Sequence, residues 1–249
     1  MSEKLNNLES TSAVEVLEWA IRRYGSRLAI ATSFQAGGMV IVDMAWRISP
    51  DIRVFTLDTG RLPVETYRMI DTVQERYGIP VEIVLPDQGE IESMVSRHGM
   101  DLFYREVPLR MLCCHMRKVR PLERKLAELD AWVTGLRREQ SESRAEVDKV
   151  ESVDGRVKIS PLADWSREQV DAYIREHDVP MHPLYAQGYT SIGCAPCTRA
   201  VTTGERERAG RWWWELDAQE ECGIHFTADG KAERAVDVLV SEIVSAAHA

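Results

Sequence analysis

The chain has 249 residues, of which 44% are hydrophobic and 29% charged, and its formal net charge is −9. This composition is ordinary for a globular protein that is large enough to bury a full core. The acidic balance argues against a general nucleic-acid surface, and no apolar run is long enough to span a membrane. Residues 1–7 are polar and do not resemble a signal peptide. We therefore expect a cytoplasmic protein whose cysteines stay reduced and bind metal or react.

The N-terminal part of the chain alternates between helical and strand patterns. A capping-box pattern, Ser12-x-x-Glu15, begins a predicted helix that ends at Gly25. Buried strands are predicted at 28–32, 54–57 and 81–85, with helices between them at 39–46 and 63–77. This alternation favours right-handed βαβ units and a parallel sheet, whose ligands bind beyond the carboxyl ends of the strands.

The C-terminal part is less regular. Cys113 and Cys114 are expected to open a basic helix that covers 116–129. Further strands are predicted at 131–134 and 156–159, and further helices at 166–177 and 232–247. The expected fold class is therefore α/β: a parallel twisted sheet flanked by helices, followed by a loop-rich C-terminal segment that contains cysteine.

Two loops at the expected carboxyl edge suit an anionic ligand. Loop 33–38 offers backbone N–H groups and a helix N-terminus to a phosphate, although its glycines are equally consistent with a tight turn alone. Loop 57–61 adds the acceptor Asp58 and the cation Arg61. Arg137 and Arg138 follow a buried strand, so we expect them at an anion site. Arg206, which lies between two glutamates, is expected to be solvated.

Five cysteines divide into a set of four and a single one. Cys113 and Cys114 are adjacent, and Cys194 and Cys197 form a C-x-x-C pair. Two such pairs in a reduced compartment usually meet at a metal. Because neighbouring Cα atoms are only about 3.8 Å apart, two adjacent sulfurs on one zinc ion would strain the backbone. The spacing favours a [4Fe–4S] cluster, and zinc remains the alternative.

Cys222 stands apart from the other four. A thiolate in a cationic pocket is a nucleophile for an anionic electrophile, whereas the neighbouring Glu220 and Glu221 oppose ionisation of the thiol. Residues 212–214 are three tryptophans, which we expect to pack in the protein or to support a partner surface.

Several motifs together resemble the assimilatory adenylylsulfate reductases, which belong to the phosphoadenylylsulfate reductase family. They are the two cysteine pairs, the stretch Gly135-Leu136-Arg137-Arg138-Glu139-Gln140-Ser141, the stretch Arg211-Trp212-Trp213-Trp214-Glu215, and Glu221-Cys222-Gly223-Ile224-His225. The resemblance covers nearly the whole chain. It implies an adenine nucleotide α-hydrolase-like fold and a [4Fe–4S] cluster. It also implies thioredoxin-dependent reduction of adenosine 5′-phosphosulfate to sulfite and AMP through a cysteine S-sulfonate, in sulfate assimilation and cysteine biosynthesis.

The resemblance also implies a role for individual residues. Cys222 matches the family's nucleophile, and Lys118 matches a lysine between cluster and substrate. The cluster ligands would be Cys113, Cys114, Cys194 and Cys197. The substrate would be bound by Ser33, Leu57, Arg61, Lys118, Arg138, Arg208 and Arg211. In loop 33–38 this chain has Gln35-Ala36 where many relatives have an acidic pair.

The resemblance further divides the chain. Residues 1–200 would form a nucleotide-binding α/β domain that carries the cluster, and residues 201–249 a C-terminal segment with the catalytic cysteine. The sequence does not determine the oligomeric state, and a homo-oligomer is one of the options. Three alternatives also remain: a phosphoadenylylsulfate reductase, a nucleotide-activating ligase or tRNA sulfur-transfer enzyme, and a non-catalytic nucleotide-binding sensor with iron–sulfur or zinc.

Overall fold

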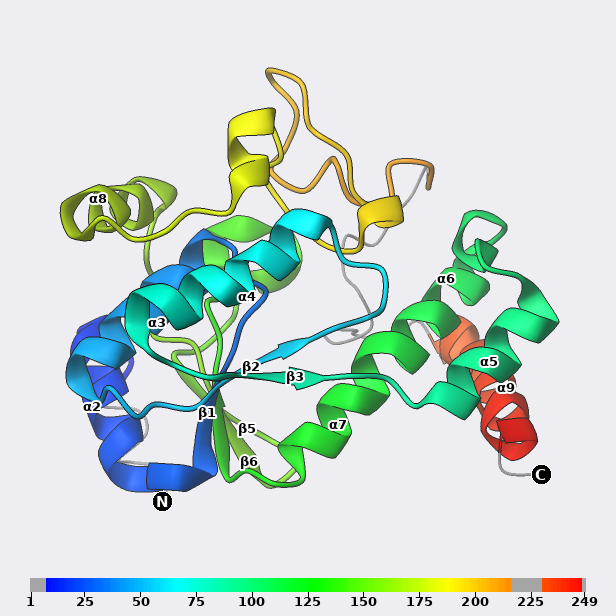
Figure 1. Cartoon of the computed structure of the whole chain (residues 1–249), viewed down its shortest axis with the longest axis horizontal. Helices are drawn as coiled ribbons and strands as arrows, with labels where there is room; N and C mark the ends of the chain where they lie inside the picture. The colour runs from blue at the N-terminus through cyan, green and yellow to red at the C-terminus, as the bar shows by residue number, and fades with distance from the viewer. Residues whose placement is uncertain (1–7, 216–229, 248–249) are drawn as a thin grey trace.

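The computed structural model describes residues 8–215 and 230–247, which form a six-stranded sheet flanked by helices (Figure 1). The strands are β1 (Leu28–Ala31), β2 (Val54–Leu57), β3 (Val81–Val84), β4 (Ala131–Val133), β5 (Val150–Val153) and β6 (Arg156–Ile159). Their order is β3-β2-β1-β4-β6-β5, and β5 pairs antiparallel to β6 at one edge while the other pairs are parallel. The fold class predicted above is confirmed.

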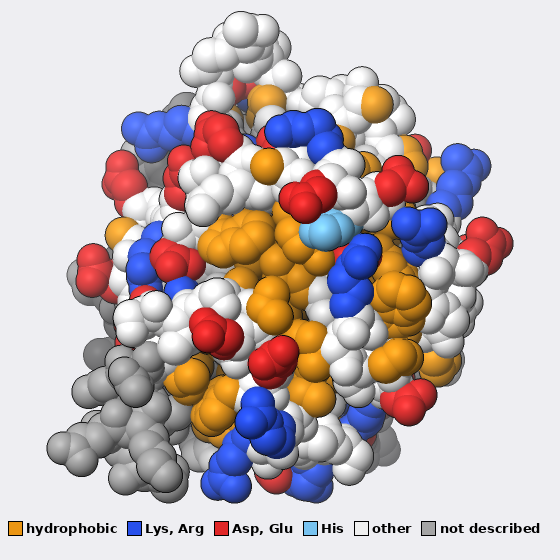
Figure 2. All heavy atoms as spheres, turned by 90° about the vertical axis from the view of Figure 1, so that its left-hand side faces the viewer, with side chains coloured by type: hydrophobic (Ala, Val, Ile, Leu, Met, Phe, Trp, Pro, Cys, Tyr) orange, Lys and Arg blue, Asp and Glu red, His pale blue; other side chains and the backbone are white. Residues whose placement is uncertain are grey.

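Alternate residues of the strands face opposite layers of helices, as the two-residue period of a strand requires. Leu28, Ile30 and Val54 point to the layer formed by α2 (Ala13–Tyr24), α3 (Ala36–Ile48), α4 (Val64–Tyr77) and α8 (Arg167–His177). Phe55 and Trp132 point to the other face, where α7 (Arg120–Leu126) packs. Figure 2 shows the end of the molecule at the left of Figure 1, where hydrophobic side chains gather among charged ones.

Local signals located most elements well. Ser12 caps α2, where its hydroxyl accepts from the backbone of Glu15 and the Glu15 carboxylate accepts in return. The predicted capping box of Ser166 likewise begins α8. The prediction missed the edge strand β5 and the helix α5 (Gln88–His98).

The prediction for the first cysteine pair was wrong in its position on the helix. Cys113 and Cys114 close α6 (Val107–Cys114), which the sequence analysis did not predict, instead of opening the next helix. A π-helical turn, His115–Val119, then connects α6 to α7. The helix is therefore continuous through the cysteines, and it already begins at Val107 because Pro108 fits its first turn.

The helices α5 and α6 and the last helix α9 (Gly230–Ala247) lie beside one another at one end of the sheet (Figure 1). Their shared core contains Met94, Leu112 and Ile243 together with the four cysteines of the two pairs and Trp212. The described part of the chain has no helix that is both long and apolar enough to cross a membrane.

A buried histidine holds the loop after α8. His182 Nε2 lies 3.0 Å from Thr66 Oγ1 on α4, and His182 Nδ1 accepts from the backbone N–H of Leu184. Burial lowers the pKa of His182. The unfolded chain, whose histidines titrate near about 6.5, therefore takes up a proton before the folded chain does. Above about pH 6.5, the free energy of unfolding should therefore contain the full contribution of neutral His182, and it should fall as the pH drops below that value.

Urea unfolding at about pH 7.5 and about pH 5.5 tests this expectation. Burial also lowers the pKa of His115, so the informative quantity is the difference between the wild type and a His182→Gln variant. The variant should lose part of the stability change between the two pH values. An equal change in both proteins would contradict the assignment to His182.

Candidate active site

A cavity of about 480 Å³ opens at the carboxyl edge of the sheet. Its wall includes Ser33 after β1, Leu57 at the end of β2 and Gly135 after β4. The strand order reverses direction between β1 and β4, and such a switch point is where open α/β sheets bind their ligands. Ser33 and Leu57 therefore lie where the sequence analysis expected a ligand.

The loops after β1 and β4 touch through their backbones. A Cβ on Gly37 would lie 2.6 Å from the carbonyl oxygen of Gly135, and a Cβ on Gly135 would lie 2.5 Å from the Gly37 carbonyl carbon. Both positions therefore require glycine for this close approach. Gln35 connects the same loop to the C-x-x-C segment: its amide donates to Ser33 Oγ at 2.9 Å and accepts from the Ile192 N–H at 2.8 Å.

Cations outnumber carboxylates on the wall of this cavity, since Glu123, Asp154 and Glu207 are its acidic residues. The cations are Lys118, Arg144, Arg156, Lys158, Arg208 and Arg211. The Arg211 guanidinium lies against Gly193, where any Cβ would clash with it, and Arg211 Nε has no hydrogen-bond partner among the described residues. A buried cation with an unused donor on a cavity wall is suited to bind an anion.

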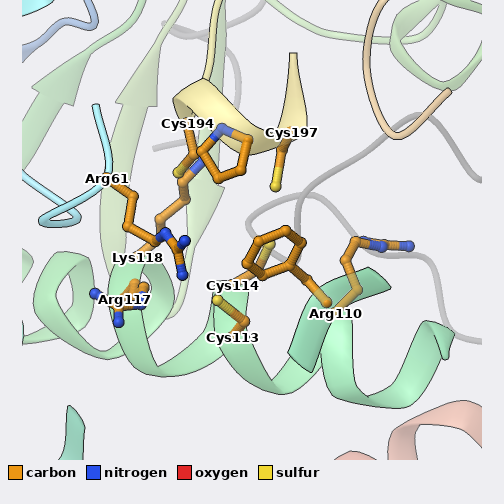
Figure 3. A pocket seen from close by; sticks show the side chains of 10 residues that line it. Arg61, Arg110, Cys113, Cys114, Arg117, Lys118, Cys194 and Cys197 are labelled. Carbon is orange, nitrogen blue, oxygen red and sulfur yellow. The ribbon is translucent and has the colours of Figure 1, made fainter. Parts of the chain in front are cut away.

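A second, smaller cavity is lined by all four cysteines of the two pairs, as Figure 3 shows. Cys113 and Cys114 reach it from the last turn of α6, and Cys194 and Cys197 from the 3-10 turn Ala195–Cys197 and the residue before it. The Ala195 N–H donates to the Arg61 carbonyl at 2.8 Å, which attaches the C-x-x-C segment to the loop after β2. Tertiary structure thus unites two pairs that lie far apart in sequence.

Burial and cations set the electrostatics of this small cavity. Burial raises the pKa of Cys113, and burial together with Cys194 raises the pKa of Cys197 to about 12. Buried Arg117 donates from Nη1 to the Thr59 carbonyl at 2.7 Å, and its Nε has no hydrogen-bond partner within residues 8–215 and 230–247. In the same two ranges, no three His, Cys, Asp or Glu side chains form a group that could hold a metal ion. An iron–sulfur cluster is a larger body that takes its ligands on separate irons, so its four cysteines need not converge on one ion.

Lys118 lines both cavities. It lies in the π-helical turn that follows Cys114. Single π-turns inside helices are frequent at functional sites because the extra residue re-aims the side chains around them. Lys118 therefore borders both the cysteine cavity and the large cavity.

Two other predicted substrate residues lie elsewhere. Arg61 lines the cysteine cavity, where its guanidinium lies over the Phe103 ring at 4.9 Å and pairs with Asp101 at 2.8 Å. The structure does not bring Arg138 to the large cavity: its side chain pairs with Glu9 and donates to the Val147 carbonyl at 2.9 Å. Arg208 and Arg211 do line that cavity, whereas Cys222 lies outside the described residues.

The structure adds residues that the sequence analysis did not name. Arg144 lines the large cavity and donates to Gln140 Oε1 at 2.6 Å, within the same loop as Arg138. Arg156 and Lys158 also line it from β6. Their spacing of two residues on a strand was a usable signal, because it places both side chains on one face.

The fold and the cavity define the class of the protein: an α/β protein with a mostly parallel sheet and a cation-rich cavity at the carboxyl edge of that sheet. Yeast FAD synthetase in complex with FAD has a similar structure, with a TM-score of 0.53 at 14% identity and coverage of 98% of this chain and 89% of that one. At this identity the likeness concerns the fold alone. A family model described as the phosphoadenosine phosphosulfate reductase domain matches residues 27–200. The chain belongs to this family.

Individual relatives agree with the family match. An adenosine 5′-phosphosulfate reductase of Allochromatium vinosum is 51% identical over 216 residues, which are 86% of this chain and 84% of the relative. Another from Burkholderia cepacia is 47% identical, with coverage of 88% of this chain and 90% of the relative. The phosphate complex of a phosphoadenylyl-sulfate reductase from Candida auris has a TM-score of 0.68 at 30% identity, and covers 81% of this chain and 98% of that one.

Proposed function

We propose that the protein is an adenylylsulfate reductase that reduces adenosine 5′-phosphosulfate to sulfite and AMP in sulfate assimilation. The proposal rests on the position of Lys118. This residue lines both the cation-rich cavity at the carboxyl edge of the sheet and the cavity of four cysteines. Two relatives that are 51% and 47% identical are named adenosine 5′-phosphosulfate reductases. Cytoplasmic location and the division at residue 200 stay predictions.

The cysteine cavity fits an iron–sulfur cluster by the chemistry of its donors. It brings together four buried thiols, burial raises the pKa of the Cys113 and Cys197 thiols, and the unused Nε donor of Arg117 suits an anionic group beside them. We propose that Cys113, Cys114, Cys194 and Cys197 hold a [4Fe–4S] cluster. When bound, the cluster would supply fixed charge and hold α6 against the C-x-x-C segment.

In the first half-reaction, the protein's cations neutralise the phosphosulfate. Lys118, Arg208 and Arg211 would bind its oxygens, and the N-terminus of α3 would face the phosphate. The Cys222 thiolate then attacks the sulfur atom, the bond between that sulfur and the bridging oxygen breaks, and AMP leaves with the bond's electron pair. The product is a Cys222 S-sulfonate.

In the second half-reaction, a dithiol protein of the thioredoxin type supplies two electrons. One of its thiolates attacks Cys222 Sγ, and sulfite leaves with the electron pair of the S–S bond. The second thiol of the donor, as its thiolate, then attacks the mixed disulfide. Cys222 is released as a thiolate and the donor becomes a disulfide.

Mass spectrometry without reductant tests the proposal most directly. Protein mixed with adenosine 5′-phosphosulfate should gain one SO₃ group on the peptide that contains Cys222, and AMP should appear in equal amount. An unmodified Cys222 peptide, with substrate present and the cluster intact, would refute the proposed chemistry.

The phosphoadenylylsulfate reductase alternative has a specific observation in its favour, because the Candida auris structure is of such an enzyme. It predicts a higher kcat/KM for the 3′-phosphorylated nucleotide, whereas our proposal predicts a higher value for adenosine 5′-phosphosulfate. Steady-state kinetics with both nucleotides separates the two.

Replacement of Lys118 by alanine is expected to lower the rate of S-sulfonation by about 10²–10³-fold, because a preorganised cation beside the developing charge is removed. Iron content should stay at the wild-type level. Lys125→Ala is the control, since Lys125 lies further along the same helical region on α7, pairs with Glu82 and Glu128, and lines neither cavity. Single-turnover kinetics checks the difference, and a wild-type rate for Lys118→Ala would contradict the role.

A further inference from the structure

A buried ion pair connects the cysteine cavity to the last residue described before Cys222. Arg110 Nε lies 2.8 Å from Glu215 Oε1, and Arg110 Nη2 donates to Glu215 Oε2 at 3.1 Å. The two side chains are 2% and 7% exposed. This bidentate geometry fixes both the distance and the orientation of the two groups.

The pair also belongs to a continuous row of side chains. The Arg110 guanidinium lies 4.7 Å from the ring centroid of Trp212, and the Arg211 guanidinium lies at the same distance from that ring. Trp212 is 1% exposed and has φ of 45°, a left-handed conformation that a tryptophan rarely adopts. Arg211 lines the large cavity and Arg110 the cysteine cavity. The row Arg211, Trp212, Arg110 therefore begins at the large cavity, reaches the cysteine cavity and ends at Glu215.

Burial of this pair removes two charges from water, and a contribution to stability alone does not explain why they are buried. Two charges removed from water are often no more stabilising than apolar side chains of the same size. A bidentate pair does, however, fix the position of the chain, because its two hydrogen bonds form together in only one relative orientation of the guanidinium and the carboxylate. In this protein the place is Glu215 against α6, the helix that ends with Cys113 and Cys114.

We propose that Arg110 and Glu215 are positioning residues for the sulfonyl transfer. The pair anchors the chain at Glu215, and Cys222 follows seven residues later. Since an extended residue spans about 3.3–3.6 Å, the seven residues after Glu215 allow the Cα of Cys222 to lie at most about 25 Å from the Cα of Glu215, so an anchored Glu215 limits the region that the thiol can reach. This inference depends on the proposed role of Cys222 as the nucleophile.

A single variant measures the effect of the anchor. Glu215→Gln keeps the shape of the side chain but removes its charge. We expect the single-turnover rate of Cys222 S-sulfonation to fall about 10–100-fold, because a misplaced reacting group loses near-attack geometry. The dissociation constant of AMP and the iron content should stay unchanged. Arg53→Gln is the matched control: it breaks the bidentate pair of Arg53 with Glu82 at the amino end of β2 and should leave the rate unchanged.

A double variant separates positioning from stability. In Arg110→Met/Glu215→Met, apolar side chains of similar length fill the space, so no buried charge is left unpaired. We expect thermal stability and iron content near the wild-type level and a rate as low as that of Glu215→Gln. A pair that only stabilises the fold would instead give a wild-type rate in the double variant.

Two other outcomes overturn the inference in distinguishable ways. A rate within twofold of the wild type in Glu215→Gln refutes the positioning role and leaves the proposed function intact. Absence of S-sulfonation in the wild-type protein itself refutes the proposed function, and the inference with it. If Glu215→Gln loses iron, the rate of the double variant decides: a low rate supports a positioning role, and a wild-type rate shows that the pair only stabilises the fold.

Discussion

Replacement of Cys222 by serine is expected to lower sulfite formation by about 10⁴-fold or more, because a serine hydroxyl does not ionise near neutral pH and cannot form the S-sulfonate. Serine differs from cysteine by one atom, and Cys222 is not among the four cysteines proposed as cluster ligands, so nucleotide binding and iron content should persist. Sulfite release with a dithiol donor, measured beside visible absorbance, checks both halves of the expectation.

The same variant separates an enzyme from a nucleotide-binding sensor. A sensor would keep its full response to nucleotide without Cys222, whereas a reductase loses turnover alone. Cys222→Ser that still produces sulfite at the wild-type rate would contradict the proposed mechanism.

Replacement of Cys194 by serine is expected to remove the cluster and with it most of the activity. Cys194 lines the small cavity with the other three cysteines, and Thr59 Oγ1 lies 3.3 Å from its sulfur. Loss of one ligand frees the segment around the 3-10 turn Ala195–Cys197 from α6, and the energy of metal binding no longer contributes to folding. We therefore expect a colourless protein with a lower unfolding temperature.

Iron and acid-labile sulfide per chain, together with thermal unfolding, measure this effect. Cys222→Ser is the matched control, since it removes a sulfur that we place outside the ligand set and should keep the wild-type iron content. A full complement of iron in Cys194→Ser would contradict the assignment of ligands. A wild-type protein that carries zinc instead of iron after anaerobic preparation would contradict the cluster itself.

Local patterns were sufficient wherever one segment carries the whole signal. The capping boxes at Ser12 and Ser166, and the apolar runs of the parallel strands, depend on neighbours a few residues away, and the structure confirms them. The same local view placed Cys113 and Cys114 at the wrong end of a helix. The π-helical turn His115–Val119, which joins α6 to α7, leaves no mark in the residue periodicity on which the prediction was based.

The sequence was enough to establish the α/β alternation, the two cysteine pairs and the loops at the carboxyl edge, because each is a property of spacing along the chain. It did not determine which cations reach the cavity. Arg138 turns to Glu9 while Arg144 lines the cavity, although both follow β4 in one loop. Nor did it predict the contact of Arg110 with Glu215. Such pairings depend on the path of the folded chain, which brings distant segments within a few ångströms of each other.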